Sequence, residues 1–96
     1  MDIEGFERSL TDDAPPAGSS APLAALWHAG RGAWAAAHEL VQDDPSSAAA
    51  WVHAWLHREE GDLPNADYWY RRAGRRPARG DLRDEWRDLA AALLDG

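Results

Sequence analysis

Two stretches of this chain repeat a pattern of apolar residues, histidine, glycine and alanine at a separation of 29 residues. In each copy an apolar run ends at a glycine, and a second run carries an alanine on its expected inner face. A glycine between two helices is typical of a helical hairpin, and a repeated hairpin predicts stacked helices. The matched positions are Leu26, Trp27, His28, Gly32, Trp34, Ala37 and Val41 in the first copy, and Trp55, Leu56, His57, Gly61, Leu63, Ala66 and Tyr70 in the second.

Helix-end signals extend this pattern to an all-α fold. Residues 1–10 are expected to form a short N-terminal helix, and residues 11–21, rich in proline, glycine and serine, a flexible linker. Residues 22–96 are expected to form one helical domain, with two stacked antiparallel hairpins and a C-terminal capping helix. No segment alternates with a period of two, so no sheet is expected. Prolines in first turns, serine or aspartate caps and terminal glycines predict helices over residues 22–30, 34–43, 48–60, 64–73 and 82–93.

Composition narrows the classes of protein that this chain can be. Six tryptophans in 96 residues predict a small core built on large aromatic side chains. The absence of cysteine excludes disulfides, thiolate catalysis and cysteine-bound metals. A formal net charge of -7 makes nucleic acid an unexpected partner, because such binding relies on cations. No apolar run approaches the ~20 residues of a membrane span, and the acidic start is unlike a secretory signal, so we expect a cytoplasmic protein.

Small and aromatic residues in the second copy follow the order Ala54, Gly61, Ala66, Tyr70, Ala73 and Pro77. This order resembles the tetratricopeptide repeat, in which small residues let paired helices approach closely and an aromatic residue fills the gap. The first copy retains Ala25, Gly32 and Ala37, and the resemblance covers residues 22–77. The separation of 29 residues is shorter than the family's repeat of about 34.

Residues 37–42, 51–58 and 68–74 also resemble small stand-alone bacterial proteins for which no activity is known. The tetratricopeptide resemblance implies a scaffold that binds a protein or peptide partner along one face of its helices.

A histidine pair marks one face of the helix predicted over residues 48–60. At about 100° per residue, His53, His57 and Glu60 fall within an arc of about 60°. Two imidazoles one turn apart with a nearby carboxylate can bind zinc, nickel or copper. An alanine follows the first histidine where the metalloprotease helix has a glutamate, which excludes that enzyme class. His38 or His28 would complete the ligand set if their helices face this arc; alternatively, the histidines are packing residues with hydrogen-bonded ring nitrogens.

An aromatic and arginine-rich segment follows in the next predicted helix. Tyr70 occupies the packing position of the repeat, which leaves Tyr68 and Trp69 to pack on the last helix or to line a groove beside Arg71 and Arg72. Aromatic and arginine residues dominate many binding hot spots. The six arginines between residues 71 and 83 have several interpretations. Two or three complement a helix dipole, and the others either bind an acidic partner in a salt-sensitive way or pair within the chain with Asp12, Asp13, Asp43, Asp44 or Glu59. A phosphate or RNA ligand is a further alternative.

The sequence therefore predicts a small helical scaffold that binds a protein or peptide, with no cofactor and no catalysis. Serines lie in the linker or at a helix cap, no nucleophile motif is present, and the carboxylates are expected on solvated faces. The alternative is a small metal-binding protein in which His53, His57 and Glu60 hold a divalent transition metal. The expected partner-binding residues are His53, His57, Tyr68, Trp69, Arg71 and Arg72.

Overall fold

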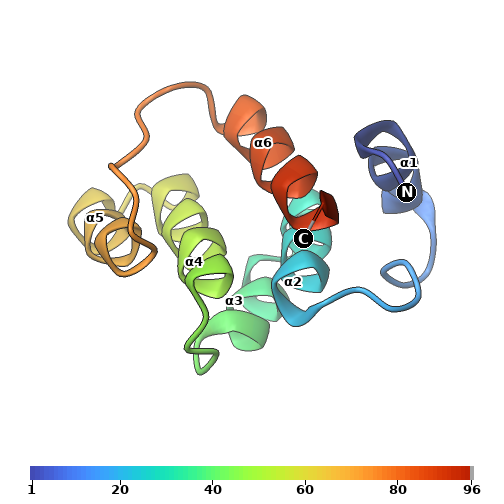
Figure 1. Cartoon of the computed structure of the whole chain (residues 1–96), viewed down its shortest axis with the longest axis horizontal. Coiled ribbons are helices and arrows are strands. Elements are labelled where there is room, and N and C mark those ends of the chain that lie inside the picture. Colours follow the sequence, from blue (N-terminus) through green and yellow to red (C-terminus); the bar gives the residue numbers. More distant parts are fainter. Residues whose placement is uncertain (96) are drawn as a thin grey trace.

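The computed structural model describes residues 1–95, and all regular structure in this range is helical (Figure 1). This confirms the all-α prediction. The elements are α1 (Ile3–Arg8), the 3-10 helix η1 (Ser9–Thr11), α2 (Ala21–Gly30), α3 (Trp34–Val41), α4 (Ser47–Glu59), α5 (Leu63–Arg72) and α6 (Leu82–Asp95). Within residues 1–95, no helix combines the length and apolar character needed to cross a membrane.

Local side-chain signals place the helix starts close to their predicted positions. The Ser46 hydroxyl accepts a hydrogen bond from the backbone N–H of Ala49 at 3.1 Å and so caps α4. The Asp62 carboxylate accepts the N–H of Asn65 at 3.3 Å and caps α5. Each cap satisfies a backbone donor that has no partner inside the helix.

The two hairpin turns share one backbone geometry. Gly32 and Gly61 both have positive φ, at +78° and +89°, a conformation that favours glycine. After each glycine, the next N–H bonds back across the turn at 2.9 Å, to the carbonyl of His28 in the first hairpin and of His57 in the second. The repeat in the sequence is therefore a repeat of local structure.

Helix α4 forms the centre of the molecule. Every residue from 49 to 57 is buried, because α4 packs against α2, α3, α5 and α6. Figure 1 shows α4 between α5 on one side and α2 and α3 on the other, with α6 packed across the group. Helix α1 lies beyond α6 and places Phe6, which is fully buried, with its ring centroid 5.6 Å from that of Trp86. The flexibility of residues 11–21 stays a prediction.

Tryptophan side chains join elements that are distant in the sequence. Each indole N–H that donates a hydrogen bond satisfies the one polar atom of a large apolar ring. The donors and acceptors are Trp27 to the Ser9 carbonyl, Trp34 to the Leu56 carbonyl, Trp51 to the Glu85 carboxylate, Trp55 to the Leu82 carbonyl and Trp86 to the Leu26 carbonyl.

Glu85 corrects the expectation that the carboxylates lie on solvated faces. Its side chain on α6 is buried and accepts from the Arg58 guanidinium at 2.6 Å, the Tyr70 hydroxyl at 2.6 Å and the Trp51 indole at 3.1 Å. Burial, together with the hydrogen bond to Glu85, raises the pKa of the Tyr70 phenol. The carboxylate thus links α4, α5 and α6, and its charge is compensated by Arg58 at a buried position.

Candidate metal centre

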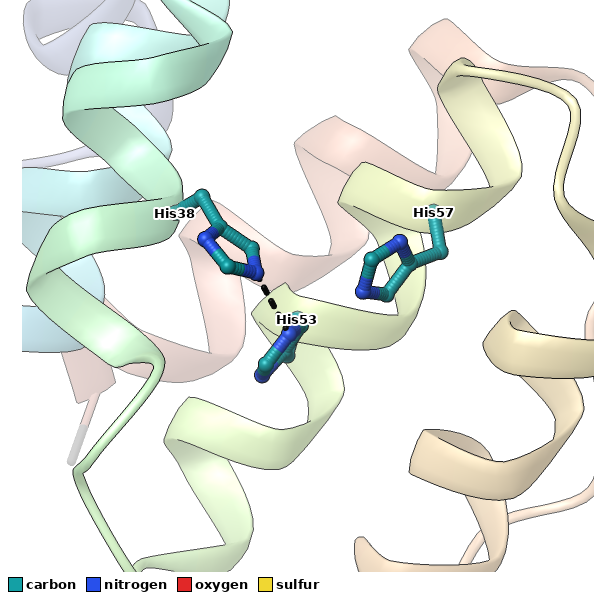
Figure 2. A group of neighbouring side chains, drawn as sticks. All are labelled: His38, His53 and His57. Atoms are coloured by element: carbon teal, nitrogen blue, oxygen red, sulfur yellow. Dashed lines mark hydrogen bonds between the residues drawn. The ribbon is translucent and has the colours of Figure 1, made fainter.

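Three imidazoles from two helices meet beside the central helix. His53 and His57 lie on successive turns of α4, and His38 reaches toward them from α3 (Figure 2). One ring nitrogen of each lies within 4.8 Å of the other two. The closest approach, 3.0 Å, joins Nε2 of His38 to Nε2 of His53. The pair predicted on one helix face is therefore completed by a third imidazole from the neighbouring helix.

Trp34 holds the third imidazole in position. It lies one turn before His38 on α3, and the two rings stack with centroids 4.8 Å apart and planes at 9°. The Trp34 indole N–H donates to the carbonyl of Leu56 on α4 at 2.8 Å. One side chain thus anchors α3 to α4 and also orients the His38 ring.

His57 has a partner at each ring nitrogen. Its Nδ1 lies 2.5 Å from Oε2 of Glu60, and its Nε2 lies 3.3 Å from Nδ2 of Asn65 on α5. A carboxylate accepts from an N–H, so Nδ1 carries the proton and Nε2 carries the lone pair. A carboxylate behind a histidine in this way is typical of metal ligands, because it fixes the tautomer and increases ligand basicity.

His53 is the most enclosed member of the group. It is 3% exposed, and Trp69 of α5 stacks on its ring with centroids 3.9 Å apart. Its Nδ1 is buried without a hydrogen-bond partner among the described residues. Leaving a buried polar atom unpaired usually costs about 1 to 3 kcal/mol, a cost that the contact of the other ring nitrogen, Nε2, with His38 does not remove.

The surroundings favour neutral imidazoles. Burial, followed by the charges of the nearby His38 and His57, lowers the pKa of His53 to about 4. Burial, followed by the charge of His57, also lowers the pKa of His38, while Glu60 opposes this shift. A neutral imidazole has the free lone pair that binds a metal, so the cluster needs little proton release to accept an ion.

The spacing suits a small divalent ion. Zinc–nitrogen bonds of about 2.0 to 2.1 Å at tetrahedral angles place two ligand nitrogens ~3.3 to 3.4 Å apart. The 3.0 Å separation between His38 and His53 is close to this value, so a small outward movement of one ring would admit the ion.

The structure separates the predicted metal ligands into two groups. Glu60 approaches His57 and Asp62, within the same 4.8 Å limit, but it is not part of the three-histidine group. His28 lies elsewhere, with its ring edge-on to Trp27 at 5.0 Å. His38 is difficult to recognise as a ligand from the sequence, because its role depends on how α3 packs against α4.

The predicted partner-binding residues divide by exposure. His53 and His57 are buried, and Trp69 is half-buried against His53. Tyr68 is 44% exposed, and the Arg72 guanidinium donates to its hydroxyl at 3.1 Å and lies 5.2 Å from the Trp69 ring centroid. Arg71 is exposed on the same helix. A partner could therefore contact the α5 residues directly, but not the two histidines beneath them.

Comparisons with known proteins identify no family for this chain. No protein-family model, curated protein or solved structure matches it. The structure itself shows a compact all-α domain of six helices over residues 1–95.

Proposed function

We propose that this protein binds a divalent transition metal through His38, His53 and His57. The observation that carries the proposal is the convergence of three imidazoles from two helices on one point. Nitrogen donors favour zinc, nickel and copper over magnesium and calcium, which prefer oxygen. Three protein ligands leave a further coordination position for water or an external ligand.

Glu60 acts behind the site in this proposal. Its carboxylate binds the Nδ1 proton of His57, and the Nε2 lone pair, which faces Nδ2 of Asn65 at 3.3 Å, would bind the metal in place of that contact. The bound ion would also replace the His38–His53 hydrogen bond with two metal–ligand bonds, so it would tie α3 to α4. Metal binding should therefore raise the thermal stability of the domain.

The test is a zinc titration of tag-free protein by calorimetry, with thermal melts in parallel. We expect one zinc per chain and a higher melting temperature. His38→Gln is the informative variant because His38 is only half-buried, so its loss should leave the fold intact. It should lower the affinity by at least about 100-fold, beyond the 10- to 100-fold typical of residues behind a site.

The matched control is His28→Gln, which changes a histidine of α2 that lies outside the three-histidine group. It should leave zinc binding unchanged. The proposal fails if zinc does not bind stoichiometrically. It also fails if His38→Gln binds zinc as tightly as the control His28→Gln and the unmodified chain do. A circular dichroism spectrum of each variant without metal establishes that it is folded.

A second candidate function is the protein- or peptide-binding scaffold implied by the tetratricopeptide resemblance. In this proposal α2 with α3, and α4 with α5, act as two stacked hairpins. The exposed Tyr68 beside Arg72 supports a contact surface on α5. Tyr68→Ala should then weaken partner capture without changing zinc affinity. Equal capture by Tyr68→Ala and by the unmodified chain would contradict this function.

A further inference from the structure

An open groove lies on another part of the molecule, away from the three histidines. It forms where the start of α4, the end of α5 and the end of α6 meet, and it has a volume of about 620 Å³. This size is within the range of small-ligand and peptide-anchor sites, about 300 to 1,000 Å³. Trp51, Ala48 and Leu93 supply apolar lining, and Arg75 and Arg76 supply positive charge.

The Trp51 ring gives Arg75 a fixed support. Trp51 donates its indole N–H to Glu85 at 3.1 Å, and Arg58 in turn binds Glu85. The Arg75 guanidinium lies over the Trp51 ring, 3.3 Å from its centroid. A guanidinium stacked on an aromatic ring keeps its planar N–H edge available for a carboxylate. The groove therefore presents an oriented donor instead of a freely moving side chain.

The charges of this groove are not compensated within the described part of the chain. Arg58, Arg79, Arg83 and Arg87 each form an ion pair with a glutamate or aspartate. Over residues 1–95, neither Arg75 nor Arg76 forms an ion pair of this kind. Arg8, Arg31, Arg71 and Arg72 also form none over these residues, so the groove is distinguished by its shape and by the Arg75–Trp51 stack as well as by its charge. Charge complementarity then indicates a negatively charged ligand.

We infer that this groove binds an acidic peptide segment of a partner protein. A carboxylate of the peptide pairs with the guanidinium groups of Arg75 and Arg76, and an apolar side chain packs on Ala48 and Leu93. The mixed lining favours a peptide over a bare inorganic anion, which would leave the apolar surface uncovered. This inference does not depend on the metal site, because none of its residues belongs to the three-histidine group.

The experiment uses a fluorescent peptide of alternating glutamate and leucine, a matched lysine and leucine peptide, and inorganic phosphate. Binding is followed by fluorescence anisotropy, and the Trp51 indole N–H signal in a proton–nitrogen NMR spectrum reports the location. We expect the acidic peptide alone to bind, to move the Trp51 signal and to bind more weakly as salt is added.

Variants locate the contact. Arg75→Gln should weaken binding by about tenfold or more, as expected for loss of a charge-assisted hydrogen bond. Arg8→Gln removes the same charge from an exposed side chain of α1, outside the groove, and should have little effect. Absence of acidic-peptide binding, an equal loss in both variants, or displacement of the peptide by phosphate at similar concentration would each overturn the inference.

Discussion

The two hairpins share a turn and a histidine beside it, but differ in the polar residues around that histidine. His28 and His57 occupy equivalent positions, and both carbonyls accept the same turn hydrogen bond. Around His57 lie Glu60, His53 and Asn65. The positions 29 residues earlier, in the first hairpin, hold Arg31, Ala24 and Ala36 instead.

The first hairpin uses its turn for structure. Arg31 lies over the Trp27 ring, 4.7 Å from its centroid, and donates to the backbone carbonyls of Leu10 and Asp12. It thus secures the N-terminal segment instead of supporting a histidine. Both turns thus have a glycine of positive φ and a buried alanine, whereas the polar residues beside each turn differ and make different contacts.

The largest effect is expected where the second hairpin meets α6. Glu85→Ala leaves Arg58, Tyr70 and Trp51 without their buried acceptor. Removing one partner of a buried ion pair typically lowers the free energy of unfolding by about 3 to 5 kcal/mol. Urea denaturation measures this loss. Glu85→Gln keeps the shape of the side chain and should cost less, whereas an unchanged midpoint for Glu85→Ala would contradict the role of this residue.

A second comparison uses the equivalent alanines of the two hairpins. Ala37 and Ala66 are both fully buried and are 29 residues apart. Enlarging either to leucine should overpack its hairpin and lower the free energy of unfolding by about 1 to 3 kcal/mol. Thermal melts of Ala37→Leu and Ala66→Leu measure both losses. A variant that melts like the unmodified chain would show that its hairpin is not closely packed at that alanine.

Glu60 and Arg31 test whether the two turns have different functions. Glu60→Gln weakens the acceptor for His57 and should lower zinc affinity by about 10- to 100-fold, as for other carboxylates behind metal ligands. Arg31→Gln, at the equivalent position, should leave the affinity unchanged. Competition with a zinc-sensitive dye measures the zinc affinity of both variants. Equal affinities for the two variants would remove Glu60 from the site.

Acidification should destabilise the domain through the histidines of α3 and α4. The pKa of His53 is lowered from 6.5 to about 4, so the unfolded chain takes up a proton at a higher pH than the folded protein does. Stability from this group is therefore complete above pH 6.5 and decreases as the pH falls toward 4. His38 contributes in the same direction, and Glu60, which faces the group, opposes it.

Between pH 7 and pH 5 this corresponds to a loss of about 1 to 2 kcal/mol, at ~1.4 kcal/mol for each pKa unit. Urea midpoints at the two pH values measure it in metal-free protein. The loss should be smaller in His53→Asn and unchanged in His28→Gln. An equal loss in all three proteins would assign the pH dependence to other groups.

Much of the fold follows from local sequence signals. The glycines at 32 and 61 end their helices because positive φ suits glycine, and Ser46 caps α4 through its own hydroxyl. On α6, Trp86, Leu89 and Ala90 recur at helical spacing and are buried on one face. These features depend on residues within one or two turns of one another.

The parts that the sequence left open, such as the choice between His38 and His28, or missed, such as the burial of Glu85, depend on distant contacts. The approach of His38 to His53 depends on how α3 lies against α4, and nothing within either helix specifies that packing. Burial of Glu85 likewise requires donors on α4 and α5 to meet one residue of α6. A lone glutamate in an amphipathic stripe resembles a surface residue until its partners are known.

The central claim is that the second hairpin, with one histidine from the first, forms a metal site. The most direct measurement is a crystal structure of the protein grown with zinc, with data collected at the zinc absorption edge. The account predicts an anomalous peak about 2.0 to 2.1 Å from one ring nitrogen of each of His38, His53 and His57. A structure with no peak there, or with zinc only at other residues, would contradict it.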